Sequence, residues 1–169
     1  MKINSIVAIF DALNRSGTHY LVAGGLAVVA YGYLRLTMDI DIILKLQPDN
    51  IRRALNALRS LGYRPRVPVL LEDFADPEHR RQWIENKGMV VFQLVSDAHK
   101  TAPIDIFVQE PFDFDSVYER APSREIDRGV SIRVVPLAEL LVMKEKANRP
   151  KDQIDLIYLR KLQMDAQDA

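Results

Sequence analysis

The sequence predicts an α/β fold, in which a mixed β-sheet is flanked by helices and followed by a C-terminal helical segment. Segments with apolar residues at helical spacing alternate with short apolar segments that match core strands. In the second half of the chain, short apolar segments come in pairs separated by brief polar stretches, a pattern typical of β-hairpins. Helices interleaved with single strands and hairpins favour a mixed sheet.

The first half of the chain is expected to supply the first strands of the sheet. An apolar stripe at helical spacing ends at Ser16-Gly17, and a short apolar segment then stops at a pair of glycines. Prolines interrupt residues 63–71, so this segment is predicted to be an irregular or edge strand. We expect helices at 3–15, 26–33 and 51–61, and strands at 20–23 and 38–45.

The second half is expected to complete the sheet and then to become helical. A helical turn is predicted at 112–120, and Pro150 separates the last two helices. We expect helices at 77–86, 137–148 and 151–163, and hairpins formed by 89–95 with 103–108 and by 123–127 with 130–135. Because 169 residues suffice to bury one core, we predict a single domain over 1–169, with its core at about 18–135 and C-terminal helices at about 136–163.

Composition excludes several classes of protein. The chain has no cysteine, which rules out disulfides, thiolate catalysis and cysteine-based zinc sites. No apolar run approaches the roughly 18 residues that span a bilayer, and the N-terminus lacks the profile of a signal peptide. We therefore expect a cytoplasmic protein with no membrane partner. Twenty-three basic and 23 acidic residues give no net charge, which argues against a general nucleic-acid coat.

Basic residues are nevertheless concentrated in one part of the sequence. Five arginines fall within fifteen positions and two more follow, namely Arg52, Arg53, Arg59, Arg64, Arg66, Arg80 and Arg81. Two interpretations stay open at this point. The arginines are solvated residues of helices and turns, or they form a lip that receives a polyanionic acceptor such as RNA.

The segment Asp39-Ile40-Asp41 carries the strongest chemical signal. Because side chains alternate along a strand, Asp39 and Asp41 are expected to point to one face, about 7 Å apart. Carboxylates in this arrangement repel each other and are costly to desolvate. A divalent cation removes both problems, and Mg²⁺ typically takes one or two carboxylates together with substrate phosphates. A solvated strand face also explains an isolated Asp-x-Asp, but the apolar flanks and the preceding Gly24-Gly25 favour a phosphate-handling metal site.

A third acid is needed if the site holds two ions. Phosphoryl-type transfer depends on positioning and charge neutralisation. Two metal ions about 4 Å apart can activate the attacking oxygen and stabilise the leaving pyrophosphate. Asp105 lies alone in the apolar strand predicted at 103–108, where a buried acid is costly without a partner. We predict that Asp39, Asp41 and Asp105 share one site.

Four motifs follow one another in the first quarter of the chain, namely Gly24-Gly25, a helix ending in Tyr31-Gly32, Arg35-x-Thr37 and Asp39-Ile40-Asp41. Together they resemble the signature of the nucleotidyltransferase superfamily. The chain is most similar to the branch of small bacterial AbiEii-toxin-like and minimal nucleotidyltransferases. The resemblance runs from about residue 20 to about residue 159 and is more specific in its first half. It implies the nucleotidyltransferase fold, with a third catalytic carboxylate on a strand such as that of Asp105.

The resemblance also implies roles for residues around the acidic strand. Gly24 and Gly25 would let backbone N–H groups approach a triphosphate at the start of the following helix. Arg35 and Thr37 match the family's approach to the acidic strand. Two interpretations of Arg35 stay open, since its guanidinium can pair with a phosphate or lock the loop through a carboxylate.

A second resemblance lies near the C-terminus, where Lys144 precedes the segment Arg149-Pro150-Lys151-Asp152 and then Asp155. The family has a lysine followed by an Arg-x-Lys-Asp-x-x-Asp-Leu pattern, and that lysine reaches the nucleotide phosphates. The resemblance implies this role for Lys144, with Lys146 as an alternative and Lys151 as a weaker one. Asp152 and Asp155 are expected to cap and order the last helix, because Asp is favourable near a helix N-terminus.

The implied function is transfer of a nucleotidyl group from a nucleoside triphosphate, such as ATP, to an acceptor hydroxyl. The implied cofactor is Mg²⁺, with Mn²⁺ as the other suitable ion, held by Asp39, Asp41 and Asp105. The implied acceptor is RNA or tRNA in a toxin–antitoxin setting with a cognate antitoxin, or a small molecule. The alternative is a non-catalytic module that keeps the fold and binds nucleotide or a partner. Three aligned carboxylates favour the enzyme, because a binding module has no need of them.

Overall fold

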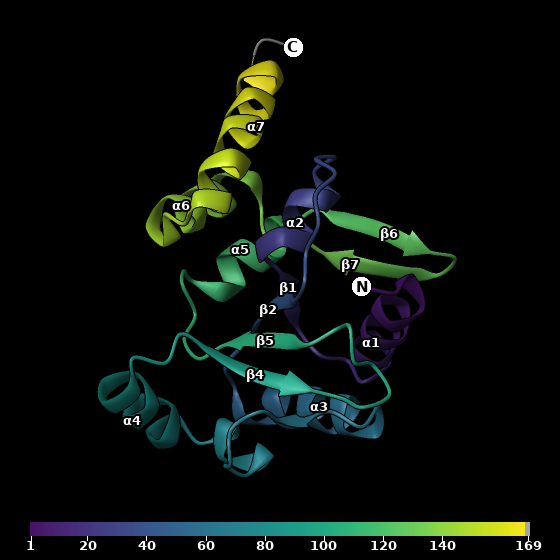
Figure 1. Cartoon of the computed structure of the whole chain (residues 1–169), viewed down its shortest axis with the longest axis vertical. Helices are drawn as coiled ribbons and strands as arrows, with labels where there is room; N and C mark the ends of the chain where they lie inside the picture. Colours follow the sequence, from purple (N-terminus) through teal and green to yellow (C-terminus); the bar gives the residue numbers. More distant parts are fainter. Residues whose placement is uncertain (168–169) are drawn as a thin grey trace.

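The computed structural model describes residues 1–167 (Figure 1). Within these residues, five strands form a mixed sheet in the spatial order β1-β2-β5-β4-β3. The strands are β1 (Tyr20–Val22), β2 (Ile40–Leu44), β3 (Arg64–Pro65), β4 (Val91–Val95) and β5 (Ile104–Phe107). β2 and β5 run parallel to each other, and the remaining neighbours are antiparallel. The predicted α/β fold with a mixed sheet is confirmed.

A separate two-stranded ribbon is formed by β6 (Ser123–Asp127) and β7 (Val130–Arg133), as predicted for this hairpin. It joins the main sheet beside β1 through a parallel bridge between Val22 and Val134. The backbone N–H of Val135 donates to the carbonyl of Val22 at 2.9 Å, which strengthens the junction. The chain therefore passes from the ribbon directly into the C-terminal helices at the edge of the sheet.

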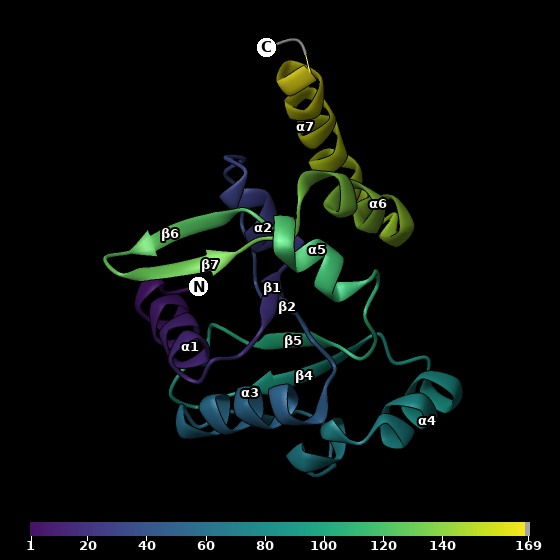
Figure 2. The ribbon, with the colours of Figure 1, turned by 180° about the vertical axis from the view of Figure 1, so that it is seen from behind.

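Helices surround the sheet and extend the molecule at one end (Figures 1 and 2). They are α1 (Ile3–Arg15), α2 (Gly24–Ala30), α3 (Pro48–Ser60), the 3₁₀ turn η1 (Leu71–Ala75), α4 (Pro77–Lys87), α5 (Phe114–Arg120), α6 (Leu137–Ala147) and α7 (Pro150–Gln167). α1 packs against α3, and α2 packs between β2 and α6. Both views show the distal part of α7 projecting away from the rest of the molecule. No helix within residues 1–167 is both long and apolar enough to cross a membrane.

The two faces of the sheet differ in polarity. In β2, Ile40 and Ile42 are fully buried, whereas Asp41 keeps part of its surface exposed. In β4, Phe92 and Leu94 are fully buried, whereas the alternate residues, including Gln93, are partly exposed. One face of the sheet is thus a packed apolar layer, and the face that carries Asp41 and Gln93 is open enough to hold a site.

Some element boundaries differ from those predicted, for reasons of hydrogen bonding. α2 begins at Gly24 rather than at residue 26, because the N–H of Ala27 already donates to the carbonyl of Ala23. β2 begins at Ile40 rather than at residue 38, because its first ladder bond runs from the Ile40 N–H to the Pro103 carbonyl at 2.9 Å. The edge strand predicted at 63–71 shrinks to two residues, and the prolines around it favour the following turn η1.

The C-terminal helices lie close to their predicted positions. α6 ends at Ala147 rather than at residue 148, and α7 runs over Pro150–Gln167 rather than 151–163. The predicted single domain spans 1–169, and residues 168 and 169 lie outside the described part of the chain. The division into a core and a C-terminal helical part stays a prediction.

Candidate active site

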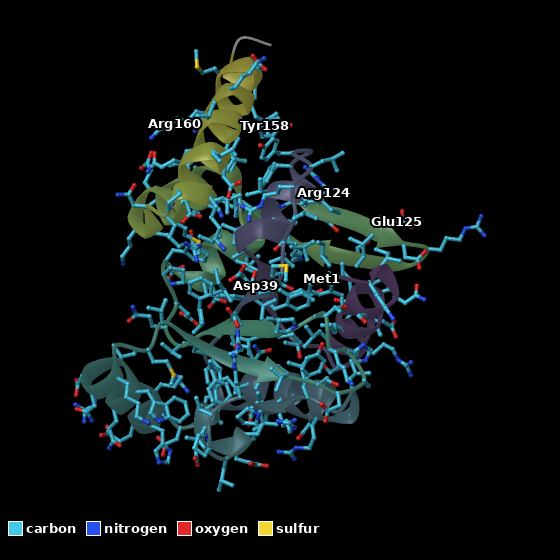
Figure 3. All side chains as sticks on the ribbon, viewed as in Figure 1. Met1, Asp39, Arg124, Glu125, Tyr158 and Arg160 are labelled. Atoms are coloured by element: carbon cyan, nitrogen blue, oxygen red, sulfur yellow. The ribbon has the colours of Figure 1, made fainter. Side chains whose placement is uncertain are left out.

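The three predicted acids border one pocket. Asp41 on β2 is the register partner of Asp105 on β5, so their side chains leave the same face of the sheet. Asp39 lies at the bend just before β2, and Figure 3 shows it near the middle of the molecule. The pocket has a volume of about 360 Å³ and is also lined by Gly24, Gly25, Arg35 and Lys144. Seven of the eight predicted site residues therefore line one cavity, and the eighth, Thr37, lies next to it.

Burial and neighbouring acids make Asp41 and Asp105 harder to ionise. Burial, followed by the charges of Asp39 and Asp105, raises the pKa of Asp41 to about 6, although Lys144 and Arg149 act in the opposite direction. Burial also raises the pKa of Asp105, with a further contribution from Asp39, against a hydrogen bond from Gln93. Only 8% of Asp105 is exposed. The pocket therefore concentrates negative charge in a partly desolvated place.

Gly24 is required by its close approach to Asp41. Its φ of +59° lies in the left-handed region. A Cβ built at Gly24 would lie 1.8 Å from Asp41 Oδ2 and 2.8 Å from Asp41 Cβ. The Asp41 carboxylate thus occupies the space that any other residue at position 24 would fill. This contact holds Asp41 against the start of α2.

Replacement of Gly24 by alanine is expected to displace Asp41 and to destabilise the protein. Gly88 is a matched control, because it has the same φ of +59° but an added Cβ would meet no atom within 4 Å. We expect Gly88→Ala to cost about 1 kcal/mol from backbone strain alone. Gly24→Ala should cost about 1–3 kcal/mol more, the usual penalty of overpacking. Urea unfolding of both variants measures this, and equal costs would mean that Asp41 does not press on Gly24.

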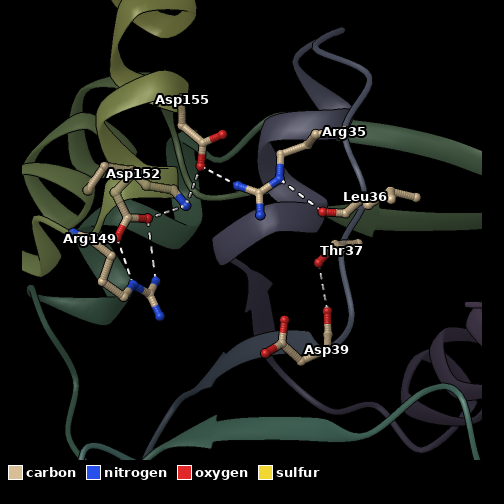
Figure 4. Close-up of polar contacts among 8 residues, drawn as sticks. Arg35, Leu36, Thr37, Asp39, Arg149, Asp152 and Asp155 are labelled. Atoms are coloured by element: carbon tan, nitrogen blue, oxygen red, sulfur yellow. Dashed lines mark hydrogen bonds and ion pairs between the residues drawn. The ribbon is translucent and has the colours of Figure 1, made fainter.

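Arg35 is held by a carboxylate. Its guanidinium pairs with Asp155 on α7, and its Nε donates to the Leu36 carbonyl at 3.3 Å (Figure 4). Of the two interpretations left open by the sequence, the structure contains the carboxylate lock. Thr37 Oγ1 donates to the carbonyl of Asp39 at 3.2 Å, which helps to shape the bend before β2. Arg35 therefore joins the acidic loop to the C-terminal helices.

Lys144 lies at the centre of a buried ion network. Only 4% of it is exposed, and its Nζ contacts Asp152 at 3.0 Å and Asp155 at 2.8 Å. Figure 4 shows the two carboxylates, Asp152 and Asp155, together with Arg35. Lys144 also borders the pocket, whereas Lys146 is exposed and does not line it, and Lys151 does. The contact between Lys144 and phosphate stays a prediction, since two carboxylates already use its charge.

Asp152 orders the beginning of α7, as expected. It is the third residue of the helix, and its Oδ2 accepts from the Arg149 backbone N–H at 3.1 Å and from Arg149 Nε at 2.7 Å. Burial alone would raise the pKa of Asp152, but the hydrogen bonds from Arg149 and Lys144 lower it to about 2. Asp155 lies one turn further on and is not a cap. It is instead the buried partner of Arg35 and Lys144.

Two residues at the site were not assigned a role from the sequence. Arg149 lines the pocket, and hydrogen bonding to Asp152 together with the charges of Asp41 and Asp39 raises its pKa. Gln93 on β4 donates from Nε2 to Asp105 Oδ1 at 2.7 Å. Arg149 belongs to the C-terminal motif that resembles the family pattern, so the sequence contained an indication of its role. Gln93 could be found only from the pairing register of β4 and β5.

The arginine-rich part of the sequence does not form an uncompensated basic lip. Four of its arginines pair with nearby acids, as Arg52–Asp49, Arg59–Glu72, Arg64–Asp97 and Arg81–Glu78. Arg80 is buried and donates to the carbonyl of Phe74 at 2.6 Å. These pairs favour the interpretation as ordinary helix and turn residues. Arg66 is connected to the acidic site, because its guanidinium donates to Gln93, which in turn donates to Asp105.

The donor chemistry of the pocket fits a hard divalent cation. Three carboxylates face one cavity, and none of them forms an ion pair with lysine or arginine within the described part of the chain. Burial and the charges of Asp39 and Asp105 raise the pKa of Asp41, and such a cation would neutralise these charges. Among residues 1–167, however, no three His, Cys, Asp or Glu side chains converge tightly enough to form a metal centre by themselves. The residues therefore supply suitable ligands without a closed coordination cage, which leaves room for ligands from a substrate.

The fold is shared with solved nucleotidyl-transferring enzymes. The crystal structure of ANT(2")-Ia in complex with adenylyl-2"-tobramycin matches with a TM-score of 0.57 and 14% sequence identity, covering 98% of this chain and 91% of that one. The lincosamide antibiotic adenylyltransferase LnuA, in its lincomycin-bound crystal structure, matches with a TM-score of 0.57 and 14% identity, covering 93% and 95%. At this identity the likeness shows the fold alone.

No curated protein matches the sequence. The family model described as nucleotidyl transferase AbiEii toxin of type IV toxin–antitoxin systems matches residues 8–169, which is almost the whole chain. This family fits the paired glycines, the acidic strand and the third acid that the structure gathers around one pocket. The chain belongs to the AbiEii nucleotidyltransferase family and is an enzyme of the nucleotidyltransferase class.

Proposed function

We propose that the protein transfers a nucleotidyl group from a nucleoside triphosphate to an acceptor hydroxyl in a reaction that depends on Mg²⁺ or Mn²⁺. The observation that carries this proposal is the row of carboxylates on β2 and β5, which share a pocket and oppose one another's ionisation. Asp39, Asp41 and Asp105 would hold the metal. When bound, the ion supplies charge neutralisation at the phosphates and favours the ionised form of the attacking oxygen.

Asp105 is proposed to accept the proton of the acceptor hydroxyl. Its Oδ1 is engaged by Gln93, which leaves Oδ2 for this purpose. Its raised pKa, caused by burial and by Asp39, makes it a better base than an exposed aspartate. In the transfer, the acceptor oxygen forms a bond to the α-phosphorus while the bond from that phosphorus to the bridging oxygen breaks. Pyrophosphate leaves with the electron pair.

The triphosphate is proposed to lie between the start of α2 and the start of α7. Gly24 and Gly25 line the pocket at the start of α2, where backbone N–H groups favour a phosphate. Arg149 and Lys151 border the same pocket from the opposite side, and 56% of the Arg149 side chain is exposed. Lys144, which also lines the pocket, would add its positive charge. These cations offset the repulsion between the phosphates and the three aspartates.

The proposed acceptor is an RNA, with tRNA as the first candidate, and the setting is a cytoplasmic toxin that has a cognate antitoxin. The family description supports this reading, since it names a toxin of a type IV toxin–antitoxin system. A small-molecule hydroxyl is the competing acceptor, because one of the two solved structures contains adenylyl-2"-tobramycin and the other contains lincomycin. The two acceptors give different labelled products.

The test is to incubate the protein with Mg²⁺ and each α-labelled nucleoside triphosphate in the presence of total bacterial RNA. Parallel reactions contain an aminoglycoside or a lincosamide instead of RNA. We expect label in RNA with the wild type, and at least a hundredfold less with Asp39→Ala or Asp41→Ala. Asp97→Ala is the matched control, because Asp97 is an exposed aspartate outside the pocket.

The outcomes separate three readings. Label in the antibiotic alone would replace the RNA acceptor by a small molecule. Triphosphate binding without any labelled product would support the alternative of a non-catalytic nucleotide-binding module. Equal labelling by the wild type and by the Asp41 variant would show that the proposed site is wrong.

A further inference from the structure

We infer that Gln93 and Arg66 are positioning residues that fix the orientation of the Asp105 carboxyl group. This inference rests on the proposed function, because it concerns the carboxylate that would hold metal and accept a proton. The four side chains Asp41, Asp105, Gln93 and Arg66 follow one another in a row across β2, β5, β4 and the residue after β3. The row begins at the acidic pocket and ends at the sheet edge.

The register of the sheet creates this row. Asp41 pairs with Asp105 across the parallel strands, and Asp105 pairs with Gln93 across the antiparallel pair β4 and β5. The Arg66 backbone N–H then donates to the Gln93 carbonyl at 2.9 Å, one residue beyond the short strand β3. Because paired residues present their side chains to the same face, the four side chains lie on one side of the sheet.

Two side-chain hydrogen bonds connect the outer three members. Gln93 Nε2 donates to Asp105 Oδ1 at 2.7 Å, and the Arg66 guanidinium donates to Gln93 Oε1. Gln93 does not line the acidic pocket, so it contacts Asp105 from outside the cavity. The Asp105 oxygen that faces away from Gln93 remains available to the pocket.

Arg66 determines which end of the Gln93 amide faces Asp105. A guanidinium has donors only, so it can bond only to the amide oxygen. The amide NH₂ must therefore point towards Asp105, where it donates to a carboxyl oxygen. If Arg66 were absent, its hydrogen bond would no longer fix which end of the Gln93 amide faces Asp105. Arg66 thus fixes, through Gln93, the rotation of the Asp105 carboxyl group.

Known metal sites indicate how strongly metal binding depends on a residue that orients a ligand without binding the metal itself. Groups that orient a ligand from outside typically change metal affinity or activity by about tenfold to a hundredfold when they are removed. Arg66 is exposed and Gln93 is partly exposed, so neither is a major part of the packed core. Their removal should therefore act on the site far more than on the stability of the fold.

The experiment measures Mn²⁺ affinity by the electron paramagnetic resonance signal of the free ion, with Mn²⁺ alone as the probe. The variants are Gln93→Met, which keeps the length of the side chain and removes the donor, and Arg66→Met. Arg66→Lys is the conservative variant, because lysine is also a donor without an acceptor. Arg64→Met is the matched control, since Arg64 is an arginine of the same edge strand that pairs with Asp97.

We expect Gln93→Met and Arg66→Met to weaken Mn²⁺ binding about tenfold or more, with melting temperatures close to that of the wild type. Arg66→Lys should restore most of the affinity, and Arg64→Met should not change it. In the labelling assay, kcat should fall in the two weakened variants while the KM for the triphosphate stays unchanged, because neither residue lines the pocket.

The outcomes distinguish this inference from the proposed function. Wild-type affinity in Gln93→Met would overturn the inference while leaving the metal site in place. A loss in Gln93→Met but not in Arg66→Met would overturn the role of Arg66. Failure of the wild-type protein to bind Mn²⁺ at all would overturn the proposed function and the inference with it. A fall in melting temperature without a fall in affinity would assign both residues to the fold alone.

Discussion

Asp41→Asn is expected to reduce nucleotidyl transfer on the order of a thousandfold and, in the absence of metal, to make the protein more stable. The loss of activity follows from the removal of one charged ligand at a site that works by charge neutralisation. The gain in stability follows from the electrostatics of the apo pocket. Burial and the charges of Asp39 and Asp105 raise the pKa of Asp41 to about 6 from its ordinary value of 3.8.

The pH dependence of this gain has a definite sign. Because the folded pKa lies above the unfolded one, ionisation of Asp41 opposes folding. This penalty is absent below about pH 4, grows between pH 4 and 6, and is complete above pH 6. A difference of two pKa units corresponds to about 3 kcal/mol, and partial exposure of Asp41 reduces this to about 2 kcal/mol. We therefore expect Asp41→Asn to melt about 4–8 °C higher than the wild type at pH 7.5.

Calorimetry at pH 4 and pH 7.5, with and without Mg²⁺, checks this prediction. Mg²⁺ should stabilise the wild type and reduce or remove the advantage of the variant, because the ion binds the folded state through the same carboxylates. Asp97→Asn, at an exposed position, should show neither effect. An Asp41→Asn variant that is less stable than the wild type at pH 7.5 would contradict the proposed repulsion.

Lys144→Met is expected to lower the free energy of unfolding by about 3–5 kcal/mol, the usual cost of removing one partner from a buried ion pair. Lys144 contacts two carboxylates, and Asp152 and Asp155 are 0% and 1% exposed. Without the lysine, Asp152 keeps its bonds from Arg149, and Asp155 keeps its pair with Arg35. Lys146→Met on the same helix is the matched control and should change stability by less than about 0.5 kcal/mol.

At acidic pH, the difference in the free energy of unfolding between the wild type and Lys144→Met should become smaller. The pKa of Asp152 is lowered to about 2, so its ion pairs contribute stability that is complete above about pH 4 and is lost as the pH falls towards 2. Urea unfolding at pH 7 and pH 3 measures this. Equal stability of the Lys144 and Lys146 variants at pH 7 would mean that the buried pairs do not form in solution, which would leave Lys144 free for phosphate. If the large loss is found, inactivity of Lys144→Met does not by itself identify a phosphate contact.

The sequence predicted those parts of the molecule that depend on local spacing. α1 was predicted with its observed ends, since a single apolar stripe and Ser16-Gly17 define it. The proximity of Asp39 and Asp41 was predictable from their spacing, and Asp105 was added because the resembled family has a third carboxylate on such an apolar strand. The roles of these three residues stay predictions.

What could not be predicted depends on contacts between distant elements. The link from Gln93 to Asp105 requires the β4–β5 register, in which Gln93 lies opposite Asp105 rather than one residue away. The Arg35–Asp155 pair joins residues 120 positions apart. The counter-ions of two members of the arginine cluster belong to other segments, as Glu72 does for Arg59 and Asp97 for Arg64, so spacing could not reveal these pairs. Side-chain charge alone does not reveal whether a partner is present.

The close approach between Gly24 and Asp41 has a consequence for how this site can change over evolutionary time. The carboxylate fills the volume that the glycine leaves vacant, so the two positions determine each other. A larger residue at position 24 would need a smaller one at position 41, and a longer acid at position 41 would have no extra room beside the glycine. Position 24 therefore cannot gain a side chain while Asp41 is kept, whereas the contact sets only an upper limit on the size of the residue at position 41.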